Sequence, residues 1–183
     1  MTQTATVPRG KRRGDPIVYA HDTVPVGAEA LVRWHHPHRG LVSPVEFIDV
    51  AESTGLIVPL GDWGIGQACH QAQAWRADGV VDDAFYISVN LSTRQLSEPR
   101  LVEMVGCVLD DSGLSPGALV LEITESALML DLEAGLARLR SFKDLGIQLA
   151  LDDYGTGYSS LNRLENSRSI SSRSTRASST SSM

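Results

Sequence analysis

Short apolar runs alternate with longer amphipathic stretches from residue 16 onward. The short runs predict β-strands over residues 24–33, 84–90, 118–124 and 147–152. The last three are largely apolar, as expected of strands that are covered on both faces. Strands that alternate with helices in this way are typical of βα units, so the pattern predicts an α/β fold with a parallel sheet.

Amphipathic stretches with recognisable ends predict the helices between these strands. The segment Ser43-Pro44-Val45-Glu46 is a capping box with Pro at the first helical position, and Gly55 ends that helix. Further helices are predicted over residues 59–77, 97–112 and 132–145, each of which ends at or close to a glycine.

The two ends of the chain do not follow this pattern. Residues 1–15 predict a disordered leader. Nine of the 18 residues from Asn166 to Met183 are Ser, and a segment of this kind buries too little apolar surface to offset the entropy of ordering. The domain is therefore predicted over residues 16–164, followed by a low-complexity Ser/Arg-rich tail over residues 165–183.

Composition limits the classes of protein to which the chain can belong. Its 183 residues are enough for one domain, and 42% hydrophobic content is enough for a core. No apolar run reaches the ~18 residues that a membrane span needs. Cys69 and Cys107 form no CxxC pair, which favours free thiols in a reducing cytoplasm. The net charge of −6 argues against direct binding of DNA or RNA.

Side chains with oxygen ligands stand at or near the ends of the predicted strands. They are Glu29, Asn90, Glu122, Asp152 and Asp153. The last three groups of this series are about 30 residues apart, the length of one βα unit. In a parallel barrel the carboxyl ends of the strands converge on the face where active sites are built. Carboxylates in close company repel one another, so the series indicates bound cations.

Each of these residues also has a simpler interpretation. A single Glu near a strand is usually solvated or salt-bridged, Asn90 could satisfy backbone groups of the next turn, and Asp152 and Asp153 could cap a helix. Their regular spacing at strand ends favours the metal site. The three histidines of "WHHPHRG", at positions 35, 36 and 38, favour a surface loop, because no Cys or carboxylate at matching spacing accompanies them.

Four segments resemble the signatures of the EAL domain family, whose members are phosphodiesterases specific for cyclic di-GMP. They are "EALVRW" from Glu29, "SVNLS" from Ser88, "LEITES" from Leu121 and "DDYGTGYSSL" from Asp152. The segments follow the family's order with compatible spacing, and the resemblance extends from Pro16 to about Leu164.

The resemblance implies a modified TIM-type (β/α) barrel that binds two Mg²⁺ or Mn²⁺ ions and hydrolyses cyclic di-GMP to linear pGpG. By motif, the family's metal ligands match Glu29, Asn90, Glu122, Asp152 and Asp153. Leu31 and Arg33 match the substrate side of the first motif, where the arginine contacts a phosphate. Thr124 and Glu125 fall in a family motif as supporting residues. The family also implies a homodimer that forms near the "DDYGTG" loop.

The chain departs from the family near both of its ends. "DPIV" at residues 15–18 resembles the family's "QPIV", but "KRRG" before it does not resemble the first strand. The family's "KID" and "AEGVE" motifs, which supply a lysine and a further metal ligand, are absent from the sequence. We therefore expect an incomplete barrel with two open edges and no catalysis by this chain. A frameshift near residue 166 explains the abrupt change better than an evolved tail.

Two other classes of function stay open at this point. One is a non-catalytic module that binds cyclic di-GMP or another protein, and the second is a non-functional gene product. The retained oxygen ligands argue against slow degeneration, because a drifting sequence loses its ligands one at a time.

Overall fold

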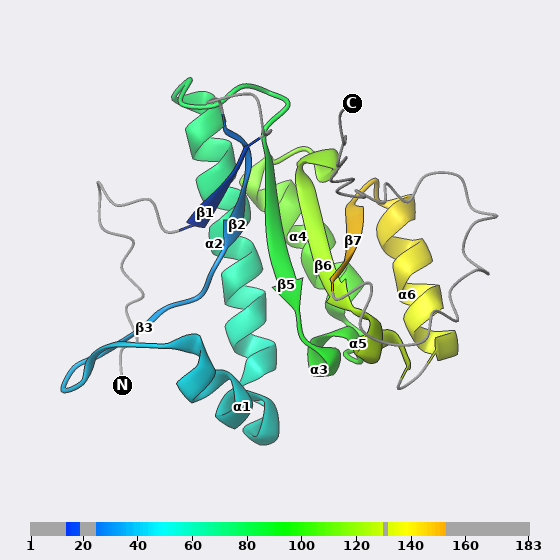
Figure 1. Cartoon of the computed structure of the whole chain (residues 1–183). Helices are drawn as coiled ribbons and strands as arrows, with labels where there is room; N and C mark the ends of the chain where they lie inside the picture. The colour runs from blue at the N-terminus through cyan, green and yellow to red at the C-terminus, as the bar shows by residue number, and fades with distance from the viewer. Residues whose placement is uncertain (1–13, 19–24, 130–131, 153–183) are drawn as a thin grey trace, which may run out of the picture.

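A sheet of five strands organises residues 14–18, 25–129 and 132–152, which are the residues that the computed structural model describes (Figure 1). The strands follow the order β1-β2-β5-β6-β7. Their bounds are β1 Gly14–Val18, β2 Pro25–Ala30, β5 Tyr86–Leu91, β6 Leu119–Thr124 and β7 Gln148–Asp152. The pairs β2–β5, β5–β6 and β6–β7 are parallel, as the βα pattern predicts, whereas β1 is antiparallel to β2.

Helices cover one face of this sheet. In the view of Figure 1, α2 and α4 lie behind the strands and α6 flanks β7. The helices are α1 Pro44–Thr54, α2 Ile57–Ala77, α3 Thr93–Leu96, α4 Leu101–Ser112, α5 Glu125–Met129 and α6 Leu132–Asp144. A 3₁₀ turn, Pro116–Ala118, precedes β6, and a separate hairpin pairs β3 Trp34–His36 with β4 Gly40–Val42. The predicted α/β class is correct.

The sheet is open in the described residues, with β1 and β7 at its two edges. No strand was predicted before residue 24, and the structure corrects this. Residues Gly14–Val18, which hold the "DPIV" segment and only the last residue of "KRRG", form β1 because these five residues find backbone partners along the edge of β2. The last two residues of the predicted leader therefore belong to the sheet, and residues 1–13 and 153–183 lie outside the described part of the chain.

The core lies between the sheet and the helices. Along β6, Leu119, Leu121 and Ile123 are 0%, 0% and 1% exposed, and they pack with residues of α2, α4 and α6 such as Ile65, Val105 and Phe142. Successive side chains of a strand point to opposite faces, so the residues between these three face the other way. That second face is polar at its carboxyl end, where Glu122 and Thr124 lie. On this second face Ser88 and Val120 are buried as well, whereas Glu122 and Thr124 at its carboxyl end are only partly buried.

The two cysteines occupy contrasting places. Cys69 is fully buried in α2, and burial raises the pKa of its thiol to about 12, so the thiol stays protonated and unreactive in the folded protein. Cys107 is exposed on α4, and both thiols are free, as predicted. In the described residues, every helix is too short or too polar to cross a lipid bilayer.

Helix ends follow the sequence signals closely. Ser43 precedes α1, the Glu46 carboxylate accepts a hydrogen bond from the Ser43 backbone N–H at 3.4 Å, and Gly55 ends the helix with a φ of 81°. The helix predicted from residue 97 instead begins at Leu101. Ser97 lies at the end of α3, a short helix that the sequence analysis missed. The signal for α3 is the pair Ser92 and Gln95, which has the spacing of a capping box.

The histidine-rich segment forms the turn between β3 and β4. His36 Nδ1 accepts hydrogen bonds from the backbone N–H groups of His38 and Arg39 at 3.1 and 3.3 Å. The ring therefore orders the turn, while Trp34 packs edge-on against Phe47 of α1 with ring centroids 5.9 Å apart. These contacts fit the predicted surface loop.

Gly27→Ala is expected to lower the free energy of unfolding by about 1–3 kcal/mol, as overpacking does in other proteins. A Cβ at Gly27 would lie 2.7–2.9 Å from the ring of Tyr86, its register partner on β5. Urea denaturation measures the change. The matched control is Gly106→Ala in α4, where a Cβ meets nothing within 4 Å. Equal effects of the two substitutions would contradict the proposed ring contact.

Candidate functional site

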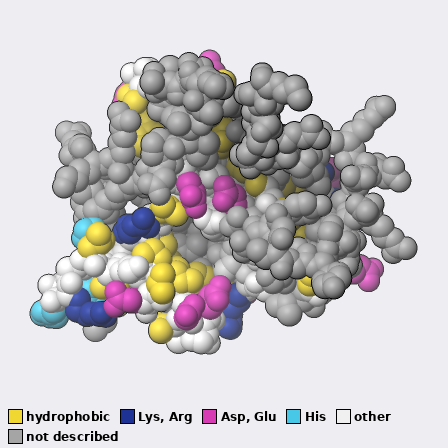
Figure 2. Space-filling model, viewed as in Figure 1, with side chains coloured by type: hydrophobic (Ala, Val, Ile, Leu, Met, Phe, Trp, Pro, Cys, Tyr) yellow, Lys and Arg dark blue, Asp and Glu magenta, His cyan; other side chains and the backbone are white. Residues whose placement is uncertain are grey.

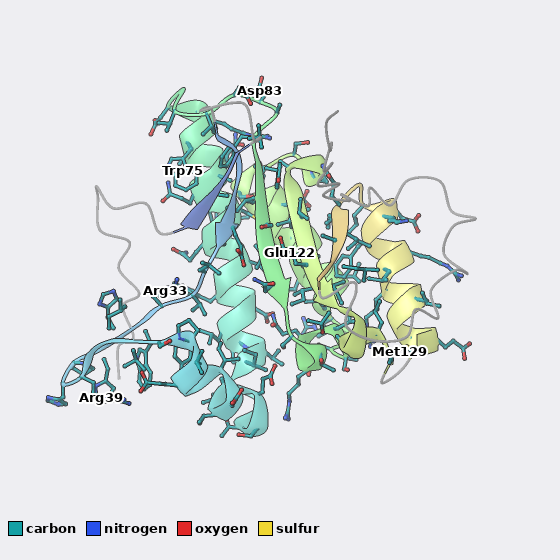
Figure 3. All side chains as sticks on the ribbon, viewed as in Figure 1. Arg33, Arg39, Trp75, Asp83, Glu122 and Met129 are labelled. Carbon is teal, nitrogen blue, oxygen red and sulfur yellow. The ribbon has the colours of Figure 1, made fainter. Side chains whose placement is uncertain are left out.

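Three of the predicted site residues come together on the polar face of the sheet. Glu29 pairs in register with Ser88, and Asn90 pairs with Glu122, so their side chains project from adjacent strands toward the same face. Asn90 Nδ2 donates a hydrogen bond to Glu29 Oε1 at 2.7 Å, across 61 positions of sequence. Figure 3 shows Glu122 in the middle of this face.

The local sequence explains why these polar groups end up together. In β5 the residues Ile87, Val89 and Leu91 are buried against the helices, so the alternation of the strand sends Ser88 and Asn90 to the other face. Parallel pairing then brings the carboxyl ends of β2, β5 and β6 to one edge. In Figure 2, acidic side chains lie near the middle of this face, with a basic side chain to their left.

The remaining predicted ligands lie at the boundary of the described residues. Asp152 is the last residue of β7 and pairs with Thr124, so its backbone lies two residues beyond the level of Glu122 on the neighbouring strand. Thr124 Oγ1 accepts a hydrogen bond from the Ala127 backbone N–H at 3.3 Å and so begins α5. Asp153 lies outside the described part of the chain, and the backbone of Glu125 opens α5.

Leu31 and Arg33 do not lie on a strand, which corrects the predicted strand over residues 24–33. β2 ends at Ala30, and its pairing with β5 ends there too, with Val89 as the last partner. The chain then leaves the sheet toward β3. Both side chains are half-buried, and Arg33 Nη1 donates to the Val32 carbonyl oxygen at 2.9 Å. In Figure 3 Arg33 lies to the left of Glu122, beyond the end of β2.

Ser88 is a site residue that the sequence analysis did not single out. Its side chain lies on the same face as Asn90, two residues before it, and beside Glu29 in register. Ser88 is 0% exposed, and its hydroxyl has no hydrogen-bond partner in the described residues. The signal in the sequence is a Ser between two β-branched apolar residues, Ile87 and Val89, in the middle of a predicted strand.

The residues present suit a hard divalent cation. Glu29, Asn90 and Glu122 offer carboxylate and amide oxygens, which Mg²⁺, Mn²⁺ and Ca²⁺ prefer, and neither thiol lies among them. Because Asn90 directs its Nδ2 group at Glu29, its Oδ1 atom points away from that bond and remains an acceptor. The described residues contain no group of three or more His, Cys, Asp or Glu side chains placed to hold a metal ion.

A cleft elsewhere on the surface does not coincide with this site. It has a volume of about 420 Å³ and lies between α2 and α4, lined by Val58, Asp62, Glu98, Arg100, Leu101, Glu103, Met104 and Cys107. Burial and, to a smaller extent, the charge of Glu98 raise the pKa of Asp62. Because its lining includes none of the described oxygen ligands, this cleft is separate from the candidate site.

Known proteins are similar to this chain in sequence and in fold. The EAL domain family model matches residues 15–169, a range slightly longer than the predicted domain. An uncharacterised signalling protein of Caulobacter vibrioides is 49% identical over 150 residues, which are 82% of this chain and 18% of that protein. The bifunctional diguanylate cyclase/cyclic di-GMP phosphodiesterase MucR of Pseudomonas aeruginosa is 43% identical over 146 residues, 80% of this chain and 21% of MucR.

Solved structures agree with these matches. The PaMucR phosphodiesterase in complex with c-di-GMP has a TM-score of 0.77 and 41% identity, over 83% of this chain and 61% of that one. The EAL enzyme Bd1971 with cAMP and cyclic di-GMP bound has a TM-score of 0.74 and 32% identity, over 83% and 42%. The chain spans about a fifth of the length of the first two relatives. Its α/β fold matches these EAL structures, as expected of an incomplete TIM-type barrel. The chain belongs to the EAL domain family.

Proposed function

We propose that this chain binds cyclic di-GMP through divalent cations held by Glu29, Asn90 and Glu122. The observation that carries the proposal is the in-register placement of these three side chains on adjacent parallel strands, with Asn90 bonded to Glu29. Two similar proteins support this ligand: MucR, a cyclic di-GMP phosphodiesterase, and the EAL enzyme Bd1971, whose structure has cyclic di-GMP bound. Asp152 and Asp153 complete the proposed set of ligands.

The protein residues have distinct parts in this proposal. The carboxylates of Glu29 and Glu122 supply negative charge, and Asn90 supplies a neutral oxygen and fixes one oxygen of Glu29. Arg33, beyond the end of β2, supplies a cation for a phosphate, and Leu31 lines the substrate side. When bound, the cations neutralise charge on a phosphodiester and activate water. This arrangement explains how a protein with a net charge of −6 takes an anionic ligand.

Catalysis is the family activity that we assign to the complete barrel, with hydrolysis of cyclic di-GMP to linear pGpG. Within these 183 residues no segment resembles the family's "KID" or "AEGVE" motif. We therefore propose that the 183-residue polypeptide, by itself, does not turn over cyclic di-GMP. Binding without catalysis is therefore the function that we propose for this polypeptide by itself, and the trio of oxygen ligands supports it.

Further features complete the proposal. The cations are Mg²⁺ or Mn²⁺, the chain acts in the cytoplasm, and it associates as a homodimer through the "DDYGTG" segment. DNA and RNA are not proposed as ligands, because the net charge of −6 disfavours direct binding of nucleic acid. Each of these statements follows from family resemblance or charge.

Calorimetric titration with cyclic di-GMP tests the binding proposal. Heat is expected in Mg²⁺ or Mn²⁺ and is expected to vanish with EDTA, because the ligand reaches the acidic site only through cations. Chromatography of the same samples is expected to show pGpG formation at less than about 1% of the rate of the PaMucR phosphodiesterase domain, since a two-metal site without its full set of groups loses transition-state charge stabilisation.

Different results test the two parts of the proposal, which are binding through cations and the absence of catalysis. Equal heats with and without EDTA would contradict cation-mediated binding. Rapid formation of pGpG by the 183-residue polypeptide would contradict the inactive state and leave binding intact. Absence of any heat favours the third class, a product without function.

A further inference from the structure

The short helix α3 directly follows the site strand β5. Asn90 and Leu91 end the strand, Ser92 turns the chain, and α3 runs over Thr93–Leu96. A four-residue helix cannot hold its own position, because a single turn has few internal hydrogen bonds. Contacts from neighbouring elements must therefore fix it.

Gln95 provides the most buried of these contacts. It is 2% exposed, and its Oε1 atom accepts hydrogen bonds from the Ser92 backbone N–H at 3.2 Å and the Ser92 hydroxyl at 3.0 Å. The Gln95 backbone N–H in turn donates to the Ser92 hydroxyl oxygen at 3.2 Å. These reciprocal bonds form a capping box, and they fix the backbone two residues after Asn90.

The far end of the Gln95 side chain lies against α2. A Cβ at Gly61 would lie 2.8 Å from Gln95 Oε1 and closer still to its Cδ and Nε2 atoms, so the amide occupies the space that any other residue at position 61 would fill. Gly64 and Gly66, on the same helix, have nothing within 4 Å of such a Cβ. Gly61 is thus the glycine of α2 that makes a slot for a side chain.

The Nε2 atom of Gln95 is buried without a hydrogen-bond partner in the part of the chain that is described. An unpartnered buried amide costs about 1–3 kcal/mol, so the residue is a poor choice for filling space alone. A methionine has nearly the same length and lacks that penalty. The polar group is therefore explained by its oxygen, Oε1, which accepts the two hydrogen bonds from Ser92.

Two arginines hold α3 from further sides. Arg94 Nη1 donates to the Glu52 carbonyl oxygen of α1 at 2.9 Å. Arg138 Nη2 of α6 donates to the Ser97 carbonyl oxygen at 2.8 Å. Together with Gln95 in the Gly61 slot of α2, these bonds connect α3 to α1, α2 and α6. They therefore also restrict the movement of the end of β5, which directly precedes α3.

We propose that Gln95, seated in the Gly61 slot, is the positioning residue for Asn90 and so for its bond to Glu29. It touches no ligand and acts through Ser92. The inference deepens the proposed function, on which it rests for the role of Asn90 as a cation ligand. Its placement of Asn90 can be measured without any ligand.

Gln95→Met separates the positioning role from space filling. Methionine keeps the volume in the slot and removes the amide that bonds Ser92, so the melting temperature is expected to change by only a few degrees. Hydrogen exchange followed by mass spectrometry is expected to show about tenfold faster exchange of the Ser92 amide, the loss expected for one hydrogen bond. An unchanged exchange rate in Gln95→Met would overturn the proposal.

Gly61→Ala tests the slot from the side of α2. It is expected to displace Gln95 and to speed exchange of the same Ser92 amide by a similar factor. Gly64→Ala is the matched control, because it adds the same methyl to the same helix in open space. If both glycine variants change exchange equally, the slot plays no part and the proposal fails. If Gly61→Ala does not fold, the double variant Gly61→Ala/Gln95→Ala is the second test, because the shorter side chain empties the slot. It is expected to fold, and its Ser92 amide is expected to exchange as fast as in Gln95→Ala alone. Failure of this double variant to fold counts against the slot.

Binding of Mn²⁺ by calorimetry gives the functional readout. In Gln95→Met the affinity is expected to fall about tenfold, while Gly64→Ala keeps the affinity of the unmodified chain. Unchanged affinity in Gln95→Met with faster exchange would show that Ser92 moves without Asn90, and would overturn the inference. If the unmodified chain binds no Mn²⁺, the proposed function fails. The positioning role is then tested by Asn90→Ala, whose effect on the melting temperature is expected to be smaller in the Gln95→Met variant than in the unmodified chain.

Discussion

Leu121→Ala is expected to lower the free energy of unfolding by about 3–5 kcal/mol, enough to unfold much of a marginally stable domain. Leu121 is 0% exposed at the centre of β6, and the substitution leaves a cavity between the sheet and the helices. Urea denaturation followed by circular dichroism measures the change. Leu41→Ala, at a residue of β4 that is 60% exposed, is the control and is expected to change stability by less than about 0.5 kcal/mol.

A small effect of Leu121→Ala would contradict the assignment of the core. The comparison of two leucines removes the contribution of the substitution itself, so the difference in stability reports burial alone. Similar losses at Leu121 and Leu41 would mean that the sheet face with Leu121 is not packed in solution.

Glu29→Gln is expected to weaken the binding of Mn²⁺ at least about 100-fold while the fold is retained. The substituted amide keeps an oxygen for the bond from Asn90 Nδ2 but loses the negative charge, and hard cations depend on charged oxygen ligands. Calorimetry with Mn²⁺ measures the affinity. Glu133→Gln, at an exposed position of α6, removes the same charge away from the site and is expected to leave the affinity unchanged.

Equal losses in Glu29→Gln and Glu133→Gln would show that the net charge of the protein, and not a site, governs cation binding. Loss of cyclic di-GMP binding in step with Mn²⁺ binding is the expected companion result, because the nucleotide is proposed to reach the protein through the cation. Retained nucleotide binding without Mn²⁺ would place the ligand elsewhere.

Much of the fold could be predicted from hydrophobic pattern and helix ends. The strands near residues 86–91, 119–124 and 148–152 and the capping box at Ser43 follow local rules, since burial of alternate positions and capping by side chains act within a few residues. The end of β2 could not be predicted, because it depends on where pairing with β5 stops. β1 was missed for a similar reason: an edge strand needs a partner more than a pattern of its own.

The candidate site also has features that the sequence predicts and features that it does not. The positions of Glu29, Asn90 and Glu122 near strand ends are visible in the sequence, and regular βα spacing predicts that they share an edge. The bond between Asn90 and Glu29 depends on the register of β2 against β5, which residues 61 positions apart do not reveal. Gln95 was overlooked because its partner is a glycine, which carries no side chain to mark a contact.

The antiparallel course of β1 affects how the domain is joined to whatever precedes it. Gly14 pairs with Ala30 and Asp15 with Glu29, so the chain enters the sheet at the carboxyl edge of β2 and not at the opposite edge. The amino-terminal end of β1 therefore lies one strand away from Glu29. Because Asp15 is the register partner of Glu29, the backbone hydrogen bonds of β1 help to hold the backbone of Glu29 in place at the edge of the sheet.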